Sequence, residues 1–174
     1  MVSSPHEAVM FDLKPIHREA IPEALAKAER YRLLNEPAEA ESICRDILQV
    51  DPDHQPALVM LLLALSDQFE QGLPVREARD VVPRLRGDYE RAYYSGIICE
   101  RRAKALYHHH GPGSRFTVYD WLREAMTWYE KAEALRPPGN DDAILRWNTC
   151  ARFLMRSPHL EPRVEERAEP LLSE

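Results

Sequence analysis

Three consecutive histidines, His108, His109 and His110, are the residues whose type and spacing most directly suggest chemistry. Imidazole nitrogens bind Zn²⁺ or Ni²⁺. Adjacent residues of a helix, however, point about 100° apart, so three in a row do not converge on one ion. The nearest further ligands are Glu100, two turns earlier, and Asp120, beyond the next turn. We therefore interpret the cluster as a polar helix end and expect no metal or other cofactor. A metal-binding protein that uses His108–His110 remains a less favoured alternative.

Basic and aromatic residues are mixed around the histidines. They are Arg101, Arg102, Lys104, Tyr107, Arg115, Phe116, Tyr119 and Trp121. Such a mixture suits the packing of two helices, a protein docking surface rich in Arg, Tyr and Trp, or phosphate contact with base stacking. The chain has 23 basic and 29 acidic residues, a balance that disfavours nucleic acid. We expect helix packing first, protein docking second, and no nucleic-acid partner.

The other reactive side chains form no catalytic pattern. Cys44, Cys99 and Cys150 lie far apart on apolar helix stripes, which indicates buried thiols in a reducing, cytoplasmic compartment. Gly111-Pro112-Gly113 reads as a turn and not as a phosphate-binding loop. The longest apolar run, residues 57–65, is about half the length that a bilayer needs. We expect neither an enzyme nor a membrane protein.

Apolar residues recur with helical spacing along almost the whole chain, and no segment alternates with period two. The stripes cover residues 21–34, 40–48, 58–69, 78–85, 92–106, 122–135 and 144–154. Pro37 and Pro74 suit first helical turns, and Asp51-Pro52 suits a helix end. The pattern predicts an all-α fold with seven helices in one domain, residues 17–156. An N-terminal segment, residues 1–16, precedes it, and a flexible acidic tail, residues 157–174, follows it.

The helices come in pairs with a period of about 34 residues, which is typical of a solenoid. Residues 21–54 resemble a tetratricopeptide repeat (TPR). Ala28 and Ala40 stand at its small positions, Tyr31 at a bulky one, and Asp51-Pro52 at its end. Further resemblances cover residues 55–88, 89–138 and, as a capping helix, 144–154. The resemblance implies an α-α superhelix of three helical hairpins with a C-terminal capping helix.

The third hairpin is expected to be elongated. Gly96 and Ala125 stand at small positions of the two helices of one repeat, but they lie 29 residues apart. The helical pattern continues through Tyr107 and resumes near Thr117. We therefore predict two lengthened helices that are joined at Gly111–Gly113 and project beyond the stack.

The resemblance also implies that the first helix of each pair lines a concave groove. By register, the groove residues are Leu25, Glu29, Arg32, Val59, Leu63, Tyr93, Ile97, Glu100, Arg101, Thr149 and Arg152. The family's carboxylate clamp needs Lys and Asn where this chain has Leu25 and Glu29, so that ligand class is disfavoured. Residues 57–65 are apolar on every side of their helix. Leaving Val59, Met60 and Leu63 in water would cost about 1.5–3 kcal/mol per side chain, so we expect a cover.

These expectations favour a non-catalytic adaptor or scaffold that binds a peptide or helix of another protein in the groove. The alternative is a self-assembling, oligomeric helical-repeat protein, for example a homodimer that buries the same faces. Charge is uneven along the chain: residues 89–156 carry a net charge of +3 and residues 157–174 a net charge of −3. An acidic tail or an acidic partner could therefore reach a basic face.

Overall fold

The computed structural model describes residues 11–109, 111 and 113–163, and every regular element in this part of the chain is a helix. The α-helices there are α1 (Ile21–Leu33), α2 (Pro37–Val50), α3 (Gln55–Asp67), α4 (Val75–Arg79), α5 (Asp88–His108), α6 (Ser114–Leu135) and α7 (Asp142–Arg156). Short 3-10 helices occupy Arg18–Ala20, Phe69–Gln71 and Val82–Arg84. These residues include no strand, which confirms the prediction of an all-α chain with seven helices.

Prolines and a histidine define where the helices begin. Pro22, Pro37 and Pro56 stand in the first turns of α1, α2 and α3, where an amide hydrogen is not needed. His54 caps α3, since its Nδ1 accepts a hydrogen bond of 3.2 Å from the backbone nitrogen of Ala57. Gly72 ends the 3-10 helix after α3 with a φ of 93°, a conformation that favours glycine.

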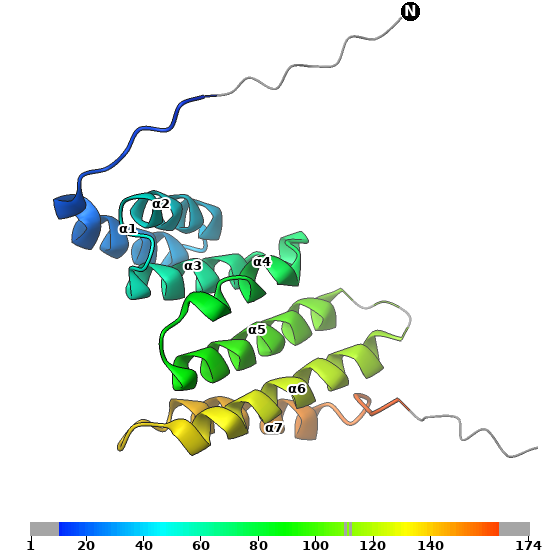
Figure 1. Cartoon of the computed structure of the whole chain (residues 1–174). Helices are drawn as coiled ribbons and strands as arrows, with labels where there is room; N and C mark the ends of the chain where they lie inside the picture. The colour runs from blue at the N-terminus through cyan, green and yellow to red at the C-terminus, as the bar shows by residue number, and fades with distance from the viewer. Residues whose placement is uncertain (1–10, 110, 112, 164–174) are drawn as a thin grey trace, which may run out of the picture.

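The helices are arranged in two layers. Figure 1 shows the pairs α1–α2, α3–α4 and α5–α6 stacked in succession, with α7 beside α6. Within the stack, α1 contacts α3 and α3 contacts α5. Side chains of α5 meet those of α7, for example the rings of Tyr107 and Phe153, whose centroids are 5.0 Å apart. We call the surface formed by α1, α3, α5 and α7 the odd-helix face.

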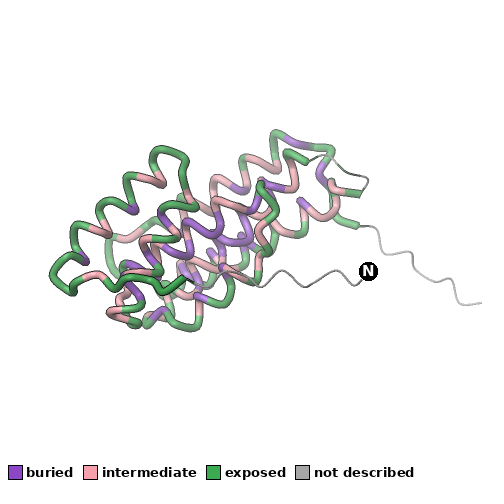
Figure 2. The backbone as a smooth tube through the Cα atoms, turned by 90° about the horizontal axis from the view of Figure 1, so that it is seen from above, coloured by how far each residue is buried: buried purple, intermediate pink, exposed green. Residues whose placement is uncertain are grey.

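The interior consists of two apolar clusters. The first lies mainly among α1 to α4, and the second lies among α5, α6 and α7. Leu63 of α3 and Tyr94 of α5 contact both clusters. Seen from above in Figure 2, the buried residues follow the middle of the stack. The two clusters are therefore joined at the contact of α3 with α5.

The third hairpin is elongated, as predicted. Helices α5 and α6 have 21 and 22 residues, whereas α1 and α2 have 13 and 14. Gly96 is buried where α5 meets α6, and a Cβ placed there would lie 2.5 Å from the Tyr129 ring. The glycine thus permits a close approach of the two helices.

The fourth helix is shorter than its apolar stripe predicts. Helix α4 has 5 residues, and the 3-10 helix Val82–Arg84 follows it. Pro83 explains the break, because its ring would clash with the carbonyl of Arg79 in a continued α-helix, and it also disfavours the helical conformation at Val82. Between α2 and α6, the layer of even-numbered helices therefore contains only the short α4 and the 3-10 helix that follows it.

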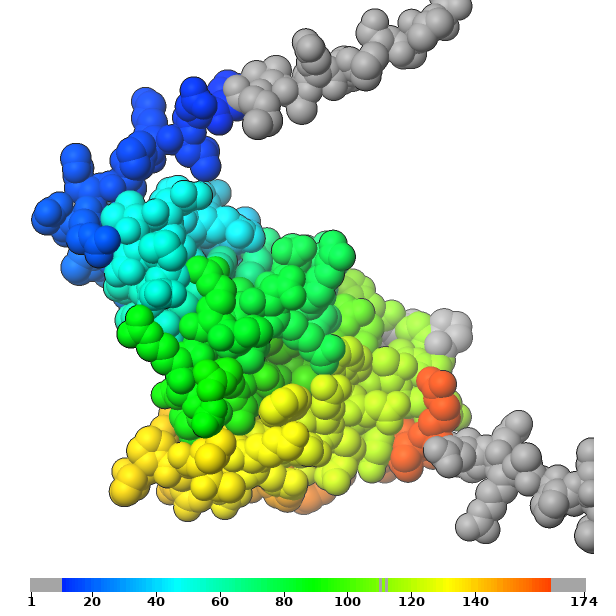
Figure 3. All heavy atoms as spheres, in the orientation of Figure 1, coloured from blue at the N-terminus to red at the C-terminus, as the bar shows by residue number. Residues whose placement is uncertain are grey.

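The folded part extends past residue 156, the predicted end of the domain. Ser157 and Leu160 are buried, and Leu160 belongs to the second apolar cluster. Glu161 Oε1 lies 3.4 Å from Arg115 Nη2 at the start of α6. Figure 3 shows these residues, in red, beside the yellow-green end of the hairpin. The sequence assigns residues 157–163 to a flexible tail because it does not reveal that Leu160 fills a gap. The rest of that tail, residues 164–174, lies outside the described residues, as do residues 1–10.

Candidate binding face

All eleven predicted groove residues lie on the odd-numbered helices, but they differ in exposure. Glu29 and Arg152 are exposed, whereas Leu25, Val59, Leu63, Tyr93 and Thr149 are half-buried. Ile97 is only 4% exposed and Glu100 is fully buried. Ile97 belongs to the second apolar cluster. The structure therefore brings the predicted helices together, but Ile97 and Glu100 do not line their surface.

An ion-pair chain closes the middle of the odd-helix face. Asp67 at the end of α3 accepts from Arg32 of α1, with Nε 2.6 Å from Oδ2, and from Arg101 of α5, with Nη1 2.5 Å from Oδ1. Arg101 Nη1 also donates to Ser66 Oγ and to the Leu63 carbonyl. Burial lowers the pKa of Arg101 from its ordinary value. Asp67, which sequence reasoning missed, thus holds α1, α3 and α5 together.

This chain provides part of the cover that the sequence analysis expects for α3. Val59, Met60 and Leu63 are half-buried and pack against the core. Arg32 Nη1 lies 4.0 Å from the Met60 sulfur, and Arg101 donates to the Leu63 carbonyl. Arginine side chains can cover apolar surface with their stems while their charged heads find partners.

Glu100 is the centre of a second polar cluster, which is buried. Its carboxylate lies 2.6 Å from Lys104 Nζ, 2.9 Å from Arg146 Nη2 of α7 and 2.8 Å from the Tyr129 hydroxyl of α6. Burial raises the pKa of Tyr129, so its hydroxyl remains protonated and donates to Glu100. Glu100 therefore ties α5, α6 and α7 together and is closed off from the surface. The sequence could not reveal this, because Arg146 is 46 residues further along the chain.

The end of the face between α5 and α7 is open. A hollow of about 330 Å³ lies here, lined by Lys104, Thr149, Arg152, Phe153, Arg156 and Ser157. Another hollow, of about 380 Å³, lies elsewhere on the molecule and is described below. Arg152 and Arg156 are exposed, and neither forms an ion pair with any described residue. Lys104 adds a third cation, although its partner Glu100 is buried beneath it. The hollow therefore presents positive charge above the half-buried ring of Phe153.

One stripe of α7 continues this surface. Leu145, Thr149, Arg152 and Arg156 recur at intervals of four, three and four residues and so share a helix face. Leu145 is 60% exposed. We call these four residues the α7 stripe. Sequence reasoning found Thr149 and Arg152 but missed Arg156, which one further step of the same spacing would have included. The sequence gives no indication that Lys104 and Phe153 line the same hollow.

The histidines contact the connection that follows α3. His108 Nδ1 lies 2.7 Å from Glu70 Oε1, and His109 Nε2 lies 3.0 Å from the Glu70 carbonyl oxygen. His110 lies outside the described residues. Within the described part of the chain, no group of three or more His, Cys, Asp and Glu side chains could hold a metal ion. The two histidines thus attach the hairpin end to the neighbouring pair of helices.

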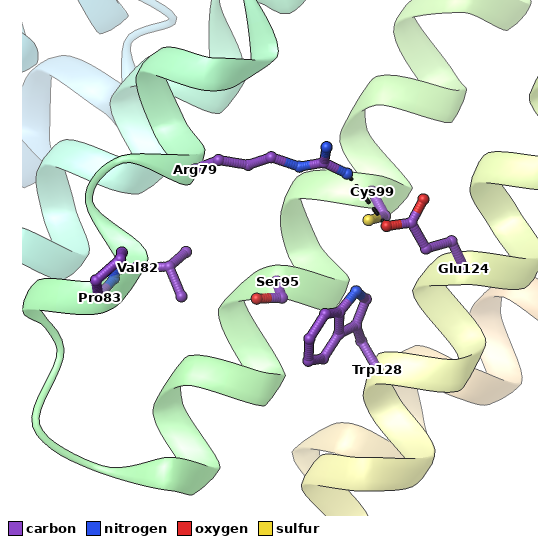
Figure 4. A pocket seen from close by; sticks show the side chains of 7 residues that line it. All are labelled: Arg79, Val82, Pro83, Ser95, Cys99, Glu124 and Trp128. Atoms are coloured by element: carbon purple, nitrogen blue, oxygen red, sulfur yellow. Dashed lines mark hydrogen bonds and ion pairs between the residues drawn. The ribbon is translucent and has the colours of Figure 1, made fainter.

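One of two hollows of about 380 Å³ in the described part of the chain lies on the side of the even-numbered helices, where α4 is short. Arg79, Val82, Pro83, Ser95, Cys99, Glu124 and Trp128 line it, and Figure 4 shows Arg79 and Glu124 beside the Cys99 sulfur. Arg79 Nη2 donates to Glu124 Oε1 over 3.1 Å. Burial raises the pKa of Cys99 to about 12, so the thiol is not a nucleophile at neutral pH.

None of the helices in the described residues combines the length and the hydropathy that a membrane crossing requires. Comparison of the chain with family models, curated proteins and solved structures gives no match. Any functional assignment therefore depends on the geometry of the chain itself.

Proposed function

We propose that this chain is a non-catalytic interaction protein with a TPR-like superhelix, and that it binds a peptide or helix of another protein on its odd-helix face. The observation that carries the proposal is a pair of exposed arginines, Arg152 and Arg156, that have no ion-pair partner among the described residues and lie beside the hollow between α5 and α7. Elsewhere on the face, Arg32, Asp67 and Arg101 satisfy one another. The open end is thus where a ligand finds positive charge that the described part of the chain does not pair.

The arrangement of the helices supports the TPR-like part of the proposal. Successive pairs stack, and the first helices of neighbouring pairs touch. Ala28, Ala40, Gly96 and Ala125, at the small positions of the motif, are all buried. Small residues are required where paired helices approach closely. The short α4 is the main departure from such a repeat.

The state of the cysteines supports a non-catalytic role. Cys44, Cys99 and Cys150 are buried, and burial raises the pKa of each to about 12. The thiolate is the nucleophilic form, and at neutral pH these groups are thiols. The buried carboxylate of Glu100 already has three partners and is equally unsuited to acid–base chemistry at the surface.

Site-specific photocrosslinking tests the proposal. A photoreactive residue at Thr149 in the α7 stripe is expected to capture an acidic or amphipathic segment of a partner, which mass spectrometry identifies. The same residue at Thr127, exposed on α6, is the matched control and should capture little. Arg152→Glu with Arg156→Glu should weaken binding of the identified segment at least about tenfold, or 1.4 kcal/mol. Arg123→Glu with Lys131→Glu, exposed on α6, should leave it unchanged.

Equal capture at both positions, or equal binding by both charge-reversed variants, would contradict a binding site on this face. Capture of a second copy of the chain at Thr149, together with a stable dimer in light scattering, would instead support the alternative of a self-assembling protein.

A further inference from the structure

Residues 164–174 have the composition that would complement the open end of the odd-helix face. They contain four glutamates, one arginine and the pair Leu171-Leu172. The hollow and the α7 stripe present Lys104, Arg152 and Arg156 together with the exposed Leu145. Both charge and apolar character are therefore matched between a surface and a segment of the same chain.

The segment starts close to the hollow. Ser157 lines the hollow, and Arg163 is the last residue before the segment. Six residues span at most about 22 Å, whereas the eleven residues from 164 to 174 can span about 36–40 Å. The segment is thus long enough to return to the hollow whatever path residues 158–163 take.

The order of residues also agrees with a return along α7. From Arg156 back to Leu145 is eleven residues of helix, or about 16 Å. Side chains of an extended segment alternate between two faces, so residues an even number apart share one face. From Glu165 to Leu171 is six residues, which span about 20 Å when extended. An extended segment antiparallel to α7 would therefore place Glu165 near Arg156 when Leu171 reaches Leu145.

We propose that residues 164–174 bind in cis to the hollow and the α7 stripe, so that an incoming partner must displace them. This inference rests on the proposed function, because it assigns the regulation of the same site. A segment on a short linker has an effective concentration of about 1 mM, so even weak intrinsic binding occupies the site. The apparent affinity for the partner is then the intrinsic affinity multiplied by the fraction of chains in which the segment is not bound.

A spin label on the full chain tests the contact. Ser173→Cys introduces a cysteine in the segment, and the three native cysteines are at most 1% exposed, so labelling is selective. Paramagnetic broadening of backbone amide signals is expected to be strongest for residues 142–149, beside Leu145, and to be absent from the exposed residues of α2. Raising the ionic strength from about 0.01 M to about 1 M shortens the Debye length from about 30 Å to about 3 Å and should remove the broadening.

Charge-reversed variants identify the groups involved. Arg152→Glu with Arg156→Glu should abolish the broadening, and so should Glu165→Lys with Glu166→Lys. Arg123→Glu with Lys131→Glu, on α6, should not. Relief of competition by Glu165→Lys with Glu166→Lys should strengthen binding of the crosslinked partner segment at least about threefold, and this variant leaves the binding face itself intact.

Broadening spread evenly over the helices would overturn the inference. So would broadening that appears only when labelled chain is mixed with a separate isotope-labelled chain, since a second copy would then be the occupant. The outcomes also separate the two proposals. Partner capture at Thr149 without any contact of the segment removes only the inference, whereas segment contact without partner capture removes the proposed function and, with it, the regulatory role of the segment, and leaves only the cis contact.

Discussion

Glu100 shows at the scale of one residue how a buried charge is stabilised in this protein. Its carboxylate is fully buried and has a lysine, an arginine and a tyrosine as partners, each from a defined position on α5, α7 or α6. The Nε atom of Arg146 is itself buried without a hydrogen-bond partner in the described structure. Removing the carboxylate would therefore leave Arg146 with little compensation.

We predict that Glu100→Ala lowers the free energy of unfolding by about 3–5 kcal/mol, because it leaves a buried guanidinium and a buried hydroxyl without their acceptor. Urea unfolding measures the loss. Glu130→Ala is the matched control: Glu130 is exposed and, among the described residues, accepts from Trp147 Nε1 alone, so its loss should stay within about 1 kcal/mol. Similar losses in the two variants would mean that the buried cluster is not stabilising.

The cysteines predict a dependence of stability on alkaline pH. An unfolded thiol loses its proton near its ordinary pKa of 9.0, whereas the folded thiols keep theirs until about 12. Unfolding therefore releases protons above pH 9, and the free energy of unfolding falls as the pH rises. From pH 8 to pH 10, each of the three cysteines should lower it by about 1.4 kcal/mol.

Urea unfolding of wild type and of Cys44→Ala at the two pH values isolates this contribution. The variant should lose about 1.4 kcal/mol less than wild type over the same interval, whatever its stability at pH 8. An identical loss in both proteins would contradict the assignment of Cys44 as a thiol that stays protonated in the fold.

At the residue scale, the sequence predicts which side chains are buried better than it predicts which side chains they contact. The cysteines lie on apolar stripes and are buried, as expected. Glu100 is assigned to the groove by register but is buried, and its partners Tyr129 and Arg146 lie 29 and 46 residues further along the chain. Periodicity reports which face of a helix a residue occupies, and it does not report which charged side chain the fold brings opposite that face.

At the scale of elements, the crossing of α5 with α6 depends on one missing side chain. We predict that Gly96→Ala lowers the free energy of unfolding by about 1–3 kcal/mol, because its Cβ would overlap the Tyr129 ring. The sign of the change in unfolding free energy is informative. Alanine stabilises an isolated helix relative to glycine by about 1 kcal/mol, so helix propensity alone would predict the opposite sign. Thermal unfolding with circular dichroism measures it.

Combining Gly96→Ala with Tyr129→Leu provides the control, because the smaller side chain removes the overlap. The loss caused by Gly96→Ala should be smaller in that background than in wild type. A stabilising Gly96→Ala substitution would show that the two helices have room to separate.

Element boundaries were predictable wherever proline, glycine or strong periodicity marked them. All seven apolar stripes correspond to α-helices, and the elongation of the third hairpin follows from the distance between Gly96 and Ala125. Helix α4 is the exception, because Ala78, Val82 and Leu85 have helical spacing while Pro83 prevents a continuous helix. The packing of Leu160 was also unpredictable, since a single apolar residue among prolines has no periodicity to interpret.

At the scale of the whole molecule, Asp67 joins three helices that no other ion pair of the described structure connects. We predict that Asp67→Ala lowers the free energy of unfolding by about 2–4 kcal/mol, because Arg32 and Arg101 both lose a carboxylate in a partly buried position. Glu124→Ala is the control, since Glu124 and its partner Arg79 are both exposed, and its loss should cost less than about 1 kcal/mol. Urea unfolding compares the two, and equal losses would contradict a special role for Asp67.

The candidate site could be predicted only in outline. The choice of α1, α3, α5 and α7 follows from the repeat period, and Thr149 and Arg152 follow from helical register. The closure of the middle of the face could not be foreseen, because it depends on Asp67 lying between arginines 35 and 34 residues away. The family resemblance itself stays a prediction, and the proposed function depends on the open end of the face.

The most extensive contacts between helices are those of sequence neighbours, above all of α5 with α6. A chain built in this way closes only short loops as it folds, which favours rapid folding from a local nucleus. We expect the long hairpin to act as this nucleus, with the remaining helices adding on either side of it along the stack. In the native state, α1 and α2 can then open without disturbing the second apolar cluster, so amide hydrogens should exchange sooner in these two helices than in α5 and α6.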